Sequence, residues 1–96
     1  MSQTATHRAI EAVWRIEAAS VIAGVARLVR DVGVAEELAQ DALVAALERW
    51  PDTGVPDNPG AWLMTTAKNR ARDRLRLDAL HTLSLIHISE PTRPER

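Results

Sequence analysis

Apolar residues recur along this chain at the spacing of an α-helix, and this spacing constrains the fold more than any other feature of the sequence. In residues 7–31 they fall three and four positions apart, which places them on one face of a helix. The chain has three Trp but no Phe or Tyr, so Ala, Leu and Val must fill its core. Small side chains favour closely packed helices, and 96 residues suffice for one small domain. The sequence therefore predicts an all-α fold, a small bundle of three to four helices.

The first helix is predicted over about residues 7–31, with Thr6 as its N-cap. This segment is long, so a bend or break near Ser20 is the alternative to one continuous helix. Gly33 is expected to end the segment, because glycine accepts the left-handed conformation just past a helix end.

The second helix is predicted over about residues 34–50, with Pro51 as its end. A turn-rich loop follows. Asn58 is expected to cap the third helix, with Pro59 at its first position, where proline is well tolerated. We expect this last helix to end at about residues 78–82.

Residues 83–93 read LSLIHISEPTR and differ in character from the rest of the chain. A single strand there would have no partner in a helical bundle. The segment matches, along its whole length, the translation of a transposase adapter used in sequencing libraries. We interpret residues 83–96 as read-through of foreign DNA that is disordered, and residues 1–82 as the genuine domain, truncated where the gene fragment stopped. A natural C-terminal tail is the alternative.

Several function classes find no support in the sequence. The chain has no Cys, which excludes disulfides and thiolate metal sites and is typical of a cytoplasmic protein. No apolar run approaches the length of a membrane span, and the N-terminus lacks an apolar signal core. His7, His81 and His87 do not cluster with carboxylates at catalytic or metal-binding spacing. We expect no enzyme activity, no cofactor and no metal.

Charge is divided between two segments, although the net charge is only −1. Residues 34–50 hold four acidic residues and one base, whereas residues 61–76 hold five bases and one acidic residue. Two faces of opposite charge indicate two different partners. Ordinary solvated helix surface is the alternative for either segment.

An acidic stripe lies on the predicted second helix. At 100° per residue, one side of this helix carries residues within about 60° of Glu37. They are Glu37, Gln40, Asp41, Val44 and Glu48. Val44 lies at the centre of the stripe, and an apolar centre with a charged rim is typical of a docking site for another helix.

The predicted third helix carries a tryptophan on its polar side. Residues within about 80° of Trp62 on the helical wheel are polar or charged. They are Thr65, Thr66, Asn69, Arg72, Asp73 and Arg76. An aromatic ring beside cations suits single-stranded nucleic acid, because bases stack and phosphates pair with cations. The alternative is that Trp62 packs under the preceding loop in a structural role.

These two segments together resemble region 2 of an extracytoplasmic-function sigma factor of bacterial RNA polymerase. Glu37, Gln40 and Asp41 match the family's acidic helix motif, and Trp62 followed seven residues later by Asn69 matches its DNA-binding helix. The segment GVPDNPGAWL is most similar to the subgroup whose full-length members carry a long helical-repeat extension. The resemblance covers about residues 7–76.

The resemblance implies a role for each set of residues. The acidic stripe would dock on the coiled coil of the polymerase β′ subunit. A loop would capture a flipped base of the non-template strand of the minus-ten element; it comprises Asp52, Thr53, Gly54, Val55 and Asp57. The last helix would contact promoter DNA through Trp62, Thr65, Thr66, Asn69, Arg70, Arg72 and Arg76.

The family's second DNA-binding domain, a helix-turn-helix, is absent from this sequence, so weak polymerase binding is expected. The resemblance leaves an anti-sigma partner open. Three alternatives from other classes stand beside it: a stand-alone helical DNA-binding or regulatory module without polymerase contact, an enzyme, and an inert helical scaffold.

Overall fold

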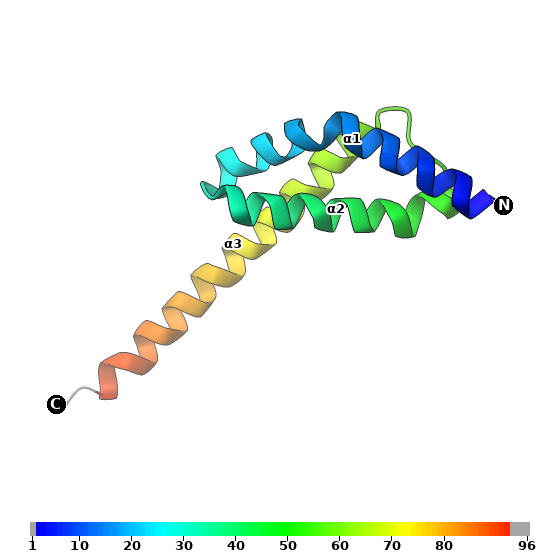
Figure 1. Ribbon diagram of the computed structural model, residues 1–96. Helices are drawn as coiled ribbons and strands as arrows, with labels where there is room; N and C mark the ends of the chain where they lie inside the picture. The colour runs from blue at the N-terminus through cyan, green and yellow to red at the C-terminus, as the bar shows by residue number, and fades with distance from the viewer. Residues whose placement is uncertain (1, 93–96) are drawn as a thin grey trace.

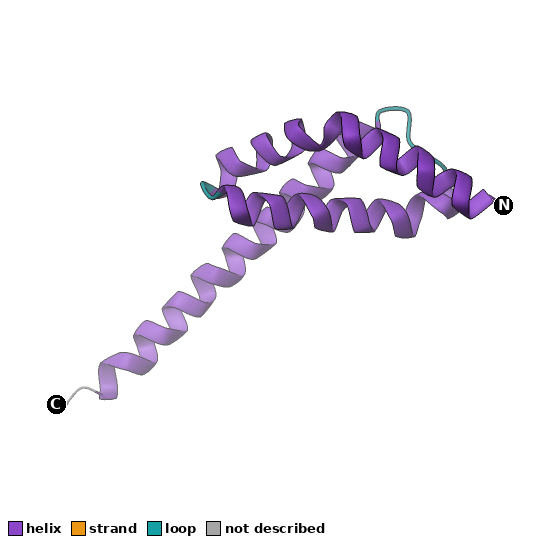
Figure 2. Cartoon of the chain, in the orientation of Figure 1, coloured by secondary structure: helices purple, strands orange, loops and turns teal. Residues whose placement is uncertain are grey.

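The computed structural model describes residues 2–92, with side chains described for residues 4–80, and these residues form three helices and no strand. The helices are α1 (Ser2–Val29), α2 (Val32–Thr53) and α3 (Pro59–Thr92). Helices α1 and α2 run antiparallel, and α3 crosses them on one side (Figure 1; Figure 2). Each helix contacts both others. The predicted all-α bundle is confirmed, with three helices in the described part of the chain.

Helix α1 is continuous, so the break considered near Ser20 does not occur. It also begins at Ser2, before Thr6, and the predicted Thr6 cap is wrong; no Gly or Pro in that stretch stops the helix. Arg30 ends α1 by adopting a left-handed φ of 61° and donating its backbone N–H to the Ala26 carbonyl at 2.7 Å.

Gly33 does not end α1, because it already lies in the first turn of α2. The N-cap of α2 is Asp31, whose carboxylate accepts a hydrogen bond from the Val34 backbone N–H at 3.0 Å. The link between the two helices therefore consists of Arg30 and Asp31 alone, which fixes α1 and α2 as a tight antiparallel pair.

Pro51 does not end α2 either. It lies in the last helical turn, where its missing N–H removes one hydrogen bond of the helix. Gly54 closes the helix with a φ of 89°, donating its N–H to the Trp50 carbonyl at 2.8 Å. Helix α3 begins as predicted, because the Asn58 side chain accepts a hydrogen bond from the Ala61 N–H at 3.1 Å.

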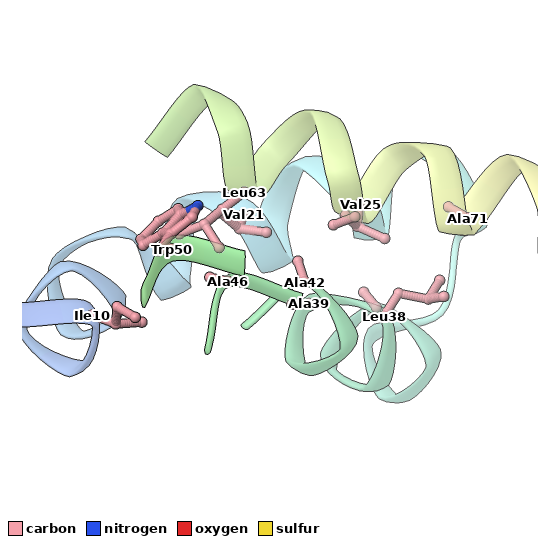
Figure 3. Close-up of a cluster of buried hydrophobic side chains, with 12 residues drawn as sticks. Ile10, Val21, Val25, Leu38, Ala39, Ala42, Ala46, Trp50, Leu63 and Ala71 are labelled. Carbon is pink, nitrogen blue, oxygen red and sulfur yellow. The ribbon is translucent and has the colours of Figure 1, made fainter. Parts of the chain in front are cut away.

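Small residues dominate the core, as the composition requires. The buried residues are Ile10, Val21, Val25, Ala35, Leu38, Ala39, Ala42, Ala45, Ala46, Trp50, Leu63, Ala67 and Ala71. The alanines of α2 let α1 and α3 approach closely, and Trp50 lies beside Leu63 and Val21, with Ile10 beyond it (Figure 3). Closely packed helices with small contact residues are what the absence of Phe and Tyr predicted.

Helix α3 leaves the bundle after Ala71, and residues 72–80 are all exposed (Figure 1). The helix continues to Thr92, so its predicted end at about residues 78–82 is wrong, and residues 83–92, expected to be disordered, are helical. The first proline after Pro59 that could interrupt the helix is Pro91, which explains its length. Residues 93–96 lie outside the described residues.

Deleting residues 83–96 is expected to leave the melting temperature unchanged within error. The preceding residues 72–80 are all exposed and bury no side chain against the bundle, although Arg74 forms a surface ion pair with Glu37. A helical extension beyond such a segment contributes little to stability. Leu63→Ala is the positive control, because truncating a buried leucine costs about 2–5 kcal/mol. A drop of several degrees in the deletion variant would show that the tail packs on the domain.

Candidate nucleic-acid interface

A hollow of about 250 Å³ lies between α2 and α3. Its lining residues are Ala45, Arg49, Trp62, Thr66, Asn69, Arg70 and Asp73. Four of these, Trp62, Thr66, Asn69 and Arg70, are residues that the sequence assigned to DNA binding. Thr66, Asn69 and Arg70 follow Trp62 by four, seven and eight positions on α3, and the helical period brings them to the same side.

Trp62 has both a structural contact and an accessible position. Its ring packs edge-on against Trp50, with 5.1 Å between the ring centroids and 67° between the ring planes. Such edge-to-face geometry is favourable for aromatic pairs. Trp50 is 1% exposed, whereas Trp62 is only partly buried and also lines the hollow. The Trp62 ring is therefore packed against Trp50 on one side and accessible to a ligand from the hollow. The structural interpretation of Trp62 and the DNA-binding interpretation are compatible.

Arg49 and Asp73 line the hollow, although the sequence analysis assigned neither to the site. Arg49 comes from α2 and adds a second cation to the hollow beside Arg70. The available signal was that Arg49 is the one base in residues 34–50, but its approach to α3 depends on helix packing. Asp73 adds a carboxylate to the wall, which disfavours a phosphate in its immediate vicinity.

Three predicted DNA-binding residues lie outside this hollow. Thr65 and Arg76 are exposed on α3 but do not line it. Arg72 points to the opposite flank of α3, where it lines a different hollow. The Arg72 guanidinium donates a hydrogen bond to the Asn69 side-chain oxygen at 3.2 Å, which orients the amide and leaves the Asn69 amide nitrogen as a donor.

The acidic stripe on α2 is solvent-exposed along its whole length, with Glu37, Gln40, Asp41, Val44 and Glu48 all on the surface. Val44 is 50% exposed. At the start of the stripe, Glu37 forms an ion pair with Arg74 of α3, with 3.3 Å between the oxygen and the nitrogen. Both side chains are well exposed, and such pairs contribute only about 0.2–1 kcal/mol.

The predicted base-capture loop is shorter than expected. Asp52 and Thr53 belong to the last turn of α2, and the loop itself spans residues 54–58. The Thr53 hydroxyl donates a hydrogen bond to the Arg49 carbonyl at 3.2 Å, which turns this side chain back onto the helix. Gly54, Val55 and Asp57 do lie in the loop, and all three are exposed.

Among residues 4–80, whose side chains are described, no group of three His, Cys, Asp or Glu is placed to hold a metal ion. The described helices include none with an apolar stretch long enough to cross a membrane.

Residues 14–79 match the sigma-70 region 2 family, and this match covers well over half of the chain. The chain therefore belongs to the sigma-70 region 2 family. Fifty-six residues are 39% identical to an uncharacterized protein of Rhizobium meliloti (strain 1021), an alignment that covers 58% of this chain and 13% of that protein. The chain thus matches only a small part of the length of this relative. No solved structure matches the chain significantly.

Truncation of the two tryptophans is expected to separate their roles. Trp50→Ala should destabilise the domain by about 3–5 kcal/mol, as for a large buried aromatic residue. Trp62→Ala should cost less, because its ring is partly solvated. Urea unfolding followed by circular dichroism measures both, with Thr65→Ala as an exposed control near zero. Equal losses for the two tryptophans would make Trp62 a purely structural residue.

Proposed function

We propose that this chain acts as region 2 of an extracytoplasmic-function sigma factor, which binds the RNA polymerase core and recognises and opens the minus-ten element of promoters. The observation that carries the proposal is the match of residues 14–79 to sigma-70 region 2, a family of transcription initiation factors rather than enzymes. Such a protein acts in the cytoplasm, on promoter DNA. The finer assignment to the extracytoplasmic-function sigma factors rests on the paired motifs, Glu37, Gln40 and Asp41 in the first and Trp62 and Asn69 in the second. The GVPDNPGAWL segment supports the subgroup with a helical-repeat extension.

The acidic stripe on α2 is the proposed polymerase-binding surface. Its charges suit the basic coiled coil of the β′ subunit, and exposed Val44 supplies an apolar centre for that contact. Because Glu37 is held only by an exposed ion pair with Arg74, it can exchange that partner for a basic residue of the polymerase at little cost.

The hollow between α2 and α3 is the proposed site for opened DNA. Trp62 offers a face for a base to stack on, and Arg49 and Arg70 offer charge for the backbone. Removing a base from the duplex stack costs a few kcal/mol, which stacking on a protein ring can offset. The loop of residues 54–58 is the proposed base-capture element, and its exposed position supports that role.

We infer that residues 83–93 derive from adapter DNA. The match to the family ends at residue 79, and this supports a change of origin shortly afterwards. Sequencing the genomic locus past codon 82 tests the inference. A continuing reading frame that encodes a different sequence, leading to a helix-turn-helix, is expected. The same LSLIHISEPTR codons in independently prepared genomic DNA would contradict it.

The combined substitution of Gln40→Ala and Asp41→Arg is expected to weaken binding to an isolated β′ coiled coil strongly. Close charge pairs at protein interfaces have coupling energies of about 1.5–7 kcal/mol, and reversal turns attraction into repulsion. Titration calorimetry measures the affinity, and circular dichroism checks that helicity is kept.

The matched control is Glu11→Arg, which makes the same change of charge as Asp41→Arg at an exposed position on α1. It should bind like the parent chain. Unchanged affinity of the stripe variant, with an unchanged spectrum, would favour a DNA-binding module without polymerase contact.

Trp62→Ala is expected to weaken binding of the chain, in complex with core polymerase, to a single-stranded oligonucleotide carrying the minus-ten non-template sequence. Loss of one stacking ring is worth about 1–3 kcal/mol. Fluorescence anisotropy of a labelled oligonucleotide measures the change. Trp62→Phe keeps an aromatic face and should retain most of the affinity. If the alanine variant binds as the parent does, the ring does not contact opened DNA.

A further inference from the structure

A second hollow, of about 290 Å³, lies on the other flank of α3, between this helix and α1. Its lining residues are Gly24, Arg27, Leu28, Lys68 and Arg72. Three of the five are cationic, and no acidic residue lines the hollow. The sequence assigned Arg72 alone to a binding role.

Close packing of α1 on α3 builds this cluster. A Cβ atom at Gly24 would lie 2.7 Å from the terminal atoms of Met64, so the absence of a side chain lets Met64 pack against the α1 backbone. One turn further along α1 stands Arg27. On α3, Lys68 and Arg72 follow Met64 by one and two turns. The helix contact thus brings cations from two helices together at defined positions.

These cations have no carboxylate partner among the residues whose side chains are described, where the single ion pair joins Arg74 to Glu37. Arg72 has one hydrogen bond, to the neutral amide of Asn69. Grouped like charges repel one another, and an anion bound among them would relieve the repulsion.

The two hollows lie on opposite flanks of α3. Arg70 and Arg72 are two residues apart, so their directions around the helix differ by about 160°. The face that carries Trp62 and Asn69 lies between them. Arg49 and Arg70 therefore provide charge on the α2 flank, and Arg27, Lys68 and Arg72 provide it on the α1 flank.

This arrangement matches the dimensions of duplex DNA. A helix with its side chains is about 10–12 Å across, and the major groove that admits a helix is about 12 Å wide, with the phosphates of one strand along each edge. Cations on both flanks of one helix are what a helix needs when it lies between two phosphate backbones.

We propose that the cluster of Arg27, Lys68 and Arg72 binds a backbone phosphate of the second DNA strand, across α3 from the strand held on the α2 flank. The proposal rests on the proposed function in taking α3 as the helix that meets DNA. It adds α1 to the DNA-binding surface, through Arg27.

The test compares binding of the full 96-residue chain to a random-sequence duplex and to a single strand of the same length, over a series of low salt concentrations. Arg27→Ala should lower duplex affinity about three- to tenfold and reduce the slope of log K against log salt by about 0.9, as for one lost phosphate contact. Single-strand affinity should stay unchanged, because one strand occupies the α2 flank.

Arg15→Ala is the matched control, since it removes the same charge from an exposed position of α1 outside both hollows. It should leave the slope as in the parent. Arg27 is exposed, so the variant is expected to fold, and circular dichroism checks this. Equal effects of Arg27→Ala and Arg15→Ala, equal losses for duplex and single strand, or no duplex binding by the parent chain would each overturn the proposal.

Inorganic phosphate is the probe for a small-anion site. If it raises the melting temperature of the parent chain but not of Arg27→Ala, while duplex affinity is the same for both, the hollow binds free anions and the proposal is overturned.

These measurements omit polymerase and use random sequence. Failure of the sigma-factor role would instead show in the β′ coiled-coil and minus-ten measurements, so the two failures are distinguishable.

Discussion

The contact between Trp50 and Trp62 holds the arrangement of helices on which the candidate site depends. Trp50 stands at the end of α2 and is 1% exposed, with its ring centroid 5.1 Å from that of Trp62. Its Nε1 finds no hydrogen-bond partner in the described part of the chain, and such a buried group costs about 1–3 kcal/mol. The burial of the large Trp50 ring and its contact with Trp62 must therefore stabilise the fold by more than this unsatisfied N–H costs. The start of α3, and with it the wall of the hollow, is fixed against α2 by this pair.

Small residues in the core allow the three helices to approach one another closely. The alanines along α2 and Gly24 on α1 allow α3 to lie against both helices. The edges of α3 then form two hollows instead of one flat surface, and cations from neighbouring helices reach each of them. The acidic stripe lies beside this region on α2, linked to α3 by the ion pair of Glu37 with Arg74. A polymerase contact at the stripe and a DNA contact at α3 would therefore meet on one rigid unit.

Much of the fold and part of the site could be predicted from the sequence, because they depend on one helix at a time. Helical spacing gave the all-α class, and Asn58 gave the start of α3. The positions of Gln40 and Asp41 on an exposed side of α2 follow from the helical period alone. Helix ends were less predictable. Arg30 ended α1 in place of Gly33, and α2 continued through Pro51, because capping and packing of the neighbouring segments decided both.

The sequence by itself determined which residues share a face of a helix, since that depends on local geometry within a few turns. It therefore placed Trp62, Thr66 and Asn69 together. Only the tertiary structure decided which helix lies beside that face. The approach of Arg49 and Arg27 to α3 has no trace in local spacing. Arg27 lies more than forty positions before Lys68, and Arg49 lies more than ten positions before Trp62, across the intervening loop. Contacts between helices depend on how the whole core packs. The small residues that permit these contacts are uncharged, so their positions in the sequence do not indicate which helix will pack against them.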